Sequence, residues 1–173
     1  MKIETLVNSK IEQDYLFLES KIQTDVLYLR NKIDMLVANS NNPIGSIRGF
    51  STNWKAFCDD EIFLRSLFPL FDYLENKIKA KPFVLTEAWG LKEGLGGFTA
   101  AHDHFPAYLS GVLYLNEHEQ LLNFPEIDRQ VQPAAGKLVL FSGFLKHYCN
   151  RITENKFKYA ISFNFSVQTD GGK

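Results

Sequence analysis

The stretch from Phe98 to Asn116 reads Phe-Thr-Ala-Ala-His-Asp-His-Phe-Pro-Ala-Tyr-Leu-Ser-Gly-Val-Leu-Tyr-Leu-Asn, and the rest of the chain is interpreted around it. Side chains alternate across a β-strand, so residues i and i+2 share a face. His102 and His104 therefore point together and Asp103 points away. Imidazole nitrogens suit iron, zinc, copper and nickel, and a metal held by one such pair needs a ligand from elsewhere. The stretch predicts a metal site.

The further ligand has few candidates, because the chain contains only 4 histidines. His118 lies in a segment typical of a turn, whereas His147 follows the strand-like run 137–141. We expect His147 to complete the site. The alternative is that the paired histidines lie in an exposed loop and hold no metal.

The composition is that of a globular protein with a large core. The 173 residues are 45% hydrophobic and carry a net charge of −1, which argues against a general nucleic-acid-binding surface. Cys58 and Cys149 follow no CxxC spacing, so a reducing cytoplasm fits better than a disulfide framework. No apolar run approaches the ~20 residues of a membrane span. We expect one cytoplasmic domain, 1–173.

Apolar residues in the N-terminal part recur in steps of three and four from Ile11 to Leu36. Ser9 and Glu12 precede them with the spacing of a capping box, and the segment 39–43 ends in proline and disfavours further helix. This pattern predicts one long amphipathic helix. It packs across the outside of a sheet or, alternatively, forms the seam of a homodimer.

A second helix is expected to follow a loop at Gly45–Asn53. Acidic residues around Asp60 suit the positive end of a helix dipole, so this helix should begin there. Pro69 predicts a break or a new helix, and Pro82 an end. Residues 1–81 are therefore expected to form a helical N-terminal part.

From Phe83 onward the sequence consists of short β-branched and aromatic runs separated by Gly, Pro and Asn. Without intervening helices, such runs predict an antiparallel sandwich or barrel. In the last run, the apolar residues from Tyr159 to Phe165 share a face suited to packing under the helices. Lys158, Ser162 and Asn164 share the other face and would meet in one pocket inside a barrel. The predicted strands are 83–91, 97–103, 108–116, 120–124, 137–142, 145–150 and 157–167.

Four blocks carry a resemblance to a known family. They are His102-Asp103-His104-Phe105-Pro106, Leu-Ser-Gly-Val-Leu-Tyr at 109–114, Gly136 to His147, and Lys-Tyr-Ala-Ile-Ser-Phe-Asn at 158–164. With them the chain resembles the iron(II)/2-oxoglutarate-dependent dioxygenases, and more narrowly a small bacterial and phage branch of that superfamily. The resemblance covers about residues 83 to 167.

The resemblance implies an α+β fold: a double-stranded β-helix (jelly roll, cupin-like) over 82–168, with the N-terminal helices on its outer sheet. We expect residues 169–173 to form a flexible tail. It implies Fe(II), 2-oxoglutarate and dioxygen as reactants, and hydroxylation of a substrate with release of succinate and carbon dioxide. The substrate would be a small molecule or a peptide side chain. By the family pattern, His102, His104 and His147 hold iron, Lys158 anchors the far carboxylate of 2-oxoglutarate, and Tyr114, Ser162 and Asn164 are candidates to hydrogen-bond it.

The chain departs from the superfamily pattern at two of these positions. His104 stands where the superfamily has a carboxylate, unless Asp103 is turned inward. Lys158 replaces the branch arginine and loses its bidentate fork, and Arg151 is a second candidate for the anchor. Two other functions therefore stay open: a three-histidine iron oxygenase that does not use 2-oxoglutarate, and a non-catalytic metal-binding jelly-roll protein.

Overall fold

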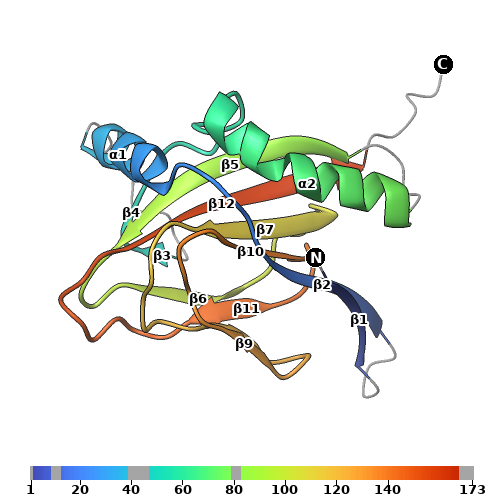
Figure 1. Ribbon diagram of the computed structural model, residues 1–173. Helices are drawn as coiled ribbons and strands as arrows, with labels where there is room; N and C mark the ends of the chain where they lie inside the picture. Colours follow the sequence, from blue (N-terminus) through green and yellow to red (C-terminus); the bar gives the residue numbers. More distant parts are fainter. Residues whose placement is uncertain (1, 9–12, 39–46, 79–82, 168–173) are drawn as a thin grey trace.

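The computed structural model describes residues 2–8, 13–38, 47–78 and 83–167, and its strands form two sheets (Figure 1). One sheet has 7 strands in the order β1-β2-β10-β7-β12-β5-β4, and the other has 5 strands in the order β3-β6-β11-β8-β9. Both sheets are open among the described residues, so a closed barrel is not formed there. The strands are β1 (Lys2–Asn8), β2 (Gln13–Lys21), β3 (Ile47–Arg48), β4 (Phe50–Ser51), β5 (Phe83–Glu93), β6 (Phe98–His102), β7 (Leu109–Tyr114), β8 (Leu122–Phe124), β9 (Arg129–Val131), β10 (Lys137–Ser142), β11 (His147–Cys149) and β12 (Lys158–Val167).

Two helices, α1 (Val26–Val37) and α2 (Glu61–Ile78), cover the outer face of the 7-stranded sheet (Figure 1). The apolar face of β12 packs under them as predicted, with the Phe63 and Phe163 rings 5.6 Å apart and the Phe71 and Phe165 rings 5.4 Å apart. The opposite face of the sheet meets the 5-stranded sheet, and a second apolar cluster lies there. This two-sided burial makes β12 and β7 almost wholly buried strands.

The predicted long N-terminal helix was wrong over residues 13–21, which form β2. Tyr15 and Phe17 pack into the cluster between the sheets, whereas Leu18 packs into the cluster under the helices. A strand buried on both faces is apolar at successive positions, so the run Tyr-Leu-Phe-Leu fits a helical period as well as a strand. The helix proper begins at Val26, after Asp25 caps it through the backbone N–H of Tyr28 (2.9 Å). The Ser9–Glu12 capping box lies outside the described residues.

The start of the second helix was predicted well. The Asp60 carboxylate accepts the backbone N–H of Phe63 (2.8 Å), and α2 begins at the next residue, Glu61. The predicted break at Pro69 was wrong, because α2 continues through this exposed proline to Ile78. The expected loop at Gly45–Asn53 holds the short strands β3 and β4, so the N-terminal part is not purely helical.

The predicted strands after Phe83 correspond to β5, β6, β7, β8, β10, β11 and β12, and β9 was missed. Gly111 of β7 illustrates why a small residue is needed in the Leu-Ser-Gly-Val block. A Cβ atom at this position would come within 2.2 Å of the Phe163 ring on the neighbouring strand β12. The absence of a side chain lets the large aromatic ring sit directly against the β7 backbone.

Candidate metal centre

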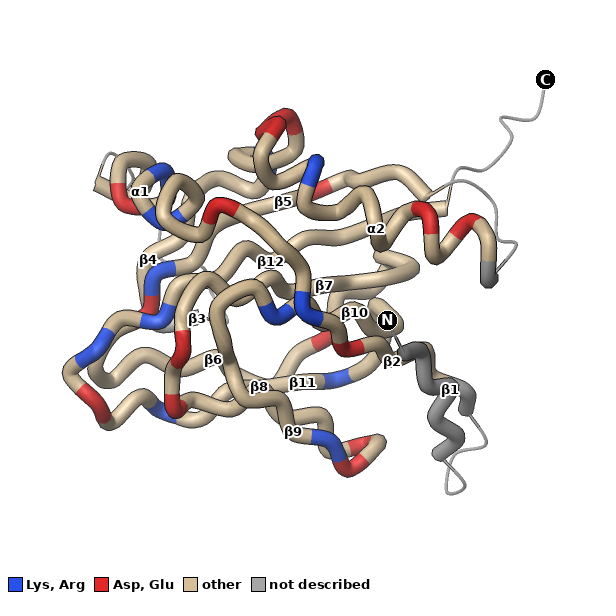
Figure 2. Tube along the Cα trace, viewed as in Figure 1, with Lys and Arg blue, Asp and Glu red and all other residues tan. Residues whose placement is uncertain are grey.

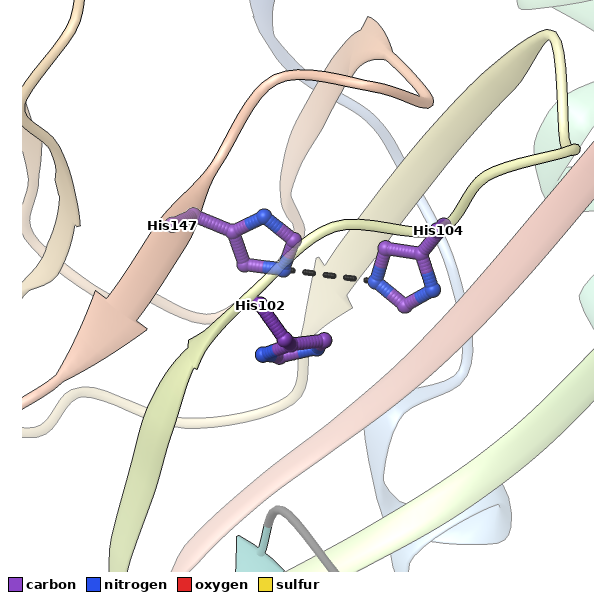
Figure 3. A group of neighbouring side chains, drawn as sticks. All are labelled: His102, His104 and His147. Atoms are coloured by element: carbon purple, nitrogen blue, oxygen red, sulfur yellow. Dashed lines mark hydrogen bonds between the residues drawn. The ribbon is translucent and has the colours of Figure 1, made fainter.

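Three histidines meet between the two sheets. His102 ends β6 and His147 begins β11, and the antiparallel pairing of these strands sets the two residues opposite each other. His104 lies just beyond β6, where its backbone N–H donates to the carbonyl of Gly143 (2.7 Å). One ligand atom from each ring lies within 4.8 Å of the others, and the rings turn toward one another (Figure 3). The cluster has the donor set and the spacing to hold a metal ion.

The Nδ1 hydrogen bonds of His102 and His147 leave the Nε2 atom of each ring available to a metal ion. Nδ1 of His102 lies 2.8 Å from the carbonyl oxygen of Ala100, and Nδ1 of His147 lies 3.0 Å from that of Leu145. A carbonyl only accepts, so each Nδ1 carries a proton and each Nε2 keeps its lone pair. Such carbonyl partners are typical of metal-binding histidines. The Nε2 atoms of His104 and His147 lie 3.3 Å apart and form a hydrogen bond, in which His104 donates to the unprotonated Nε2 of His147 (Figure 3).

The surroundings keep the rings of His104 and His147 uncharged at neutral pH. Burial lowers the pKa of His104 to about 3, and the neighbouring His147 and His102 add to the effect. Burial likewise lowers the pKa of His147 to about 4, with a further contribution from His102. A cation therefore has no proton to displace from either ring near pH 7.

The histidines share an internal space with Lys158, which we call the inner cavity. It has a volume of about 40 Å³ and is lined by both sheets. Its polar groups come from five different strands. The apolar residues are Leu91, Val112, Leu122 and Ala160, and the polar residues besides the histidines are Glu93, Thr99, Tyr114, Cys149, Lys158 and Ser162.

Lys158 is only 3% exposed and is surrounded by partners. Its Nζ lies 2.7 Å from Oε2 of Glu93, donates to Oε1 of Gln120, and lies 3.9 Å from Sγ of Cys149. Burial alone would lower the pKa of Lys158, but Cys149 and Glu93 reverse this effect and raise it. Because burial also raises the pKa of Cys149, its thiol stays neutral near pH 7. Glu93 therefore supplies the counter-charge of Lys158 among the described residues.

The sequence reasoning missed Glu93, Gln120 and Thr99. Glu93 ends β5 directly opposite Lys158 in the β5–β12 register, and Thr99 donates to its Oε1 (3.3 Å). No local pattern marks these residues, because the strands that bring them together are far apart in the chain. The polar face predicted for 157–167 was the only available signal, since it implied that Lys158 needs a buried partner.

Of the other predicted residues, Tyr114 and Ser162 line the inner cavity and Asn164 does not. Asn164 accepts a hydrogen bond from Ser110 (2.7 Å) and donates to Glu87 (2.6 Å), on the far side of His104. Burial raises the pKa of Tyr114 well above its usual value, with Cys149 and Glu93 adding to the effect, so its hydroxyl remains a donor.

Asp103, the alternative metal ligand, and Arg151, the alternative anchor for 2-oxoglutarate, lie outside the inner cavity. Asp103 accepts the backbone N–H of Phe105 (3.0 Å), and its carboxylate is not part of the three-histidine group. Arg151 donates to the carbonyl of Gly96 (2.8 Å) on the exposed surface and stacks over Phe98. Buried His118 is bound to the Lys156 carbonyl (3.1 Å) and so belongs to the loop structure.

A second, open hollow lies next to His104, and we call it the outer cavity. Its volume is about 530 Å³, and it includes Trp54, Glu87, Phe105 and Asn164. His104 lines both cavities, so the histidine cluster lies where the outer hollow approaches the inner one.

Solved structures share this architecture. The viral collagen prolyl hydroxylase of Paramecium Bursaria Chlorella virus-1, in complex with 2-oxoglutarate, has a TM-score of 0.68 at 12% identity over 86% of this chain and 94% of that one. A Pseudomonas putida prolyl-4-hydroxylase has a TM-score of 0.66 at 19% identity over 88% and 93%. HygX from Streptomyces hygroscopicus, with nickel and 2-oxoglutarate bound, has a TM-score of 0.63 at 13% identity over 88% and 82%. The fold is that of the 2-oxoglutarate/iron(II) oxygenases. No protein-family model and no curated protein matches the sequence.

The surface gives little further information on partners. Acidic and basic residues are interspersed along the trace rather than gathered into a stretch of one sign (Figure 2). Neither α1 nor α2 combines the length and the apolar composition needed to cross a bilayer. The cytoplasmic location and the homodimer stay predictions.

Proposed function

We propose that the protein is an iron(II)/2-oxoglutarate-dependent oxygenase that hydroxylates a small molecule or a peptide side chain. One observation carries the proposal: in the fold of such oxygenases, three converging histidines and a buried lysine line the same cavity. We take the two facing sheets as a form of the double-stranded β-helix. The overall change would be conversion of 2-oxoglutarate, dioxygen and a substrate C–H group to succinate, carbon dioxide and a C–OH group.

His102, His104 and His147 would hold the iron, since one ligand atom from each ring lies within 4.8 Å of the others and the Nδ1 hydrogen bonds of His102 and His147 leave their Nε2 atoms for coordination. Iron(II), when bound, supplies the activation of dioxygen that this oxidation requires. Three neutral imidazoles leave both charges of the cation uncompensated, so the site favours an anionic cosubstrate. Lys158 would bind the far carboxylate of 2-oxoglutarate through a charge-assisted hydrogen bond.

Tyr114 and Ser162 would complete the cosubstrate site, because both hydroxyls line the inner cavity with Lys158. Asn164 is not assigned to it. The apolar walls at Leu91 and Val112 would keep water from the reacting groups. The substrate would approach through the outer cavity, which is open and borders His104. Its room suits either substrate class, and the structural neighbours include both prolyl hydroxylases and an enzyme with hygromycin B bound.

The test is succinate formation from 2-oxoglutarate in air by the iron-loaded protein, without added substrate. The proposal expects slow succinate release that chelation of iron abolishes and that His147→Ala lacks. No release above the chelated control would refute it. Lys158→Ala tests the alternative of a three-histidine iron oxygenase that does not use 2-oxoglutarate. Such an enzyme would oxidise its substrate as well in Lys158→Ala as in wild type. Iron binding without any succinate would favour the non-catalytic metal-binding protein.

A further inference from the structure

The buried Glu93 is the feature of the inner cavity that the proposed function does not use. Its side chain is 1% exposed, and Oε2 lies 2.7 Å from Nζ of Lys158. Apart from the ammonium of Lys158, no described residue donates to this oxygen. The lysine proposed to bind a carboxylate of 2-oxoglutarate is thus already neutralised by a carboxylate of the protein.

We infer that Glu93 and the far carboxylate of 2-oxoglutarate compete for Lys158, so that 2-oxoglutarate binding is coupled to protonation of Glu93. This inference rests on the proposed function and assigns Glu93 as the residue that sets the affinity for the cosubstrate. Two carboxylates that share one buried site cannot both stay ionised without a large penalty, and one of them then takes up a proton.

The structure favours protonation over an outward swing of Glu93. Gly49 packs so closely against this side chain that a Cβ atom there would lie 2.8 Å from Cγ of Glu93. On the other side, Thr99 Oγ1 donates to Oε1. The carboxylate is therefore confined, and the inner cavity, at about 40 Å³, offers space for only a few water molecules. A five-carbon diacid that binds Lys158 there brings a second carboxylate against Glu93.

No other described group that faces Glu93 can compensate its negative charge once 2-oxoglutarate binds Lys158. Lys158 on β12 is the one cation among the described side chains that contact it, and 2-oxoglutarate would claim that charge. Cys149 on β11 and Tyr114 on β7 stay neutral near pH 7, because their pKa values are raised by burial. Thr99 on β6 does not titrate. Protonation of Glu93 is then the step that leaves Lys158 paired with a single charged carboxylate.

The test is calorimetric titration of 2-oxoglutarate into the anaerobic iron(II) protein between pH 6 and 8, in buffers of different ionisation enthalpy. We expect wild type to take up about one proton per 2-oxoglutarate and to lose affinity about tenfold per pH unit at the upper end. Glu93→Gln mimics the protonated acid, so its affinity should be independent of pH and at least about tenfold higher than wild type at pH 8.

Two controls isolate the effect. Glu117→Gln removes an exposed charge from the loop after β7 and should titrate as wild type does. The ligand 2-oxopentanoate keeps the 1-carboxylate and 2-oxo groups but lacks the far carboxylate, so it should bind without proton uptake. If Glu93→Gln fails to fold, the comparison of the two ligands in wild type still tests the coupling: proton uptake should accompany 2-oxoglutarate and not 2-oxopentanoate.

If wild type and Glu93→Gln bind 2-oxoglutarate with equal affinities that do not depend on pH, and without proton uptake, the role of Glu93 is wrong. The proposed function would still stand. Absence of 2-oxoglutarate binding to both proteins would refute the proposed function, and the role of Glu93 with it.

Discussion

Replacing Lys158 by Met tests whether the buried ion pair is charged in the folded protein. Lys158 and Glu93 have side chains 3% and 1% exposed with their charged atoms 2.7 Å apart. Met retains most of the aliphatic stem, so the packing loss is small, but Glu93 loses its counter-charge in a site without bulk water. Removal of one partner of a buried pair typically destabilises a protein by about 3–5 kcal/mol. We expect the free energy of unfolding to fall by about this amount.

The double variant Lys158→Met/Glu93→Gln makes the prediction sharper. Glu93→Gln alone should also be destabilising, because it leaves the lysine without a counter-charge. Removing both charges at once restores neutrality, since a buried pair replaced as a whole is often close to neutral for stability. The two single effects should therefore exceed the double effect by about 2–4 kcal/mol.

The assay is urea unfolding of the metal-free proteins at pH 7, followed by far-ultraviolet circular dichroism. The exposed pair Glu61–Arg65, with side chains 79% and 69% exposed and 3.3 Å apart, serves as the control cycle. Its coupling should be below about 0.5 kcal/mol. Additive effects of the two substitutions would show that Lys158 and Glu93 do not act as an ion pair.

Three further predictions concern the metal site and the core. His104→Ala should abolish stoichiometric iron binding, whereas Asp103→Ala should not; the reverse result, measured by metal analysis after gel filtration, would make Asp103 the ligand. The pKa values of His104 and His147 in the folded protein, about 3 and about 4, lie below the ordinary 6.5, so the unfolded chain binds more protons between these limits. The stability of the metal-free protein should therefore fall as the pH drops from about 6.5 to about 4, by up to about 1.4 kcal/mol per pH unit for each histidine, and a flat urea-midpoint profile over this range would contradict it. Gly111→Ala should lower the free energy of unfolding by about 1–3 kcal/mol because its Cβ overlaps the Phe163 ring, and an unchanged urea midpoint would contradict that packing.

The sequence was most informative where a local period met a chemically specific residue. The alternation of 157–167 placed Lys158 on the inner face and the aromatic residues under the helices, as the structure has them. The pair His102 and His104 was expected to converge because both lay on a strand. They do converge, but β6 ends at His102, and the Gly143 carbonyl rather than strand geometry holds the His104 backbone.

The failures share one physical cause, which is that local patterns do not report long-range pairing. β2 reads as helix because it is buried on both faces, and its place between β1 and β10 is set by strands elsewhere in the chain. Asn164 shares the polar face of β12 with Lys158 but reaches the outer cavity, because the strand extends past the histidine cluster. The sequence did not indicate that Glu93 contacts Lys158, because only the register of β5 against β12 places the two residues opposite each other.

Whether Lys158 binds 2-oxoglutarate beside the iron can be measured by titrating 2-oxoglutarate into the anaerobic iron(II) protein and recording the visible charge-transfer band of the complex. We expect wild type to develop the band, and Lys158→Met to keep its iron but to need about 10- to 150-fold more 2-oxoglutarate, because a charge-assisted hydrogen bond of about 1.5–3 kcal/mol is lost. Absence of the band in wild type, or equal affinities of the two proteins for 2-oxoglutarate, would contradict this prediction.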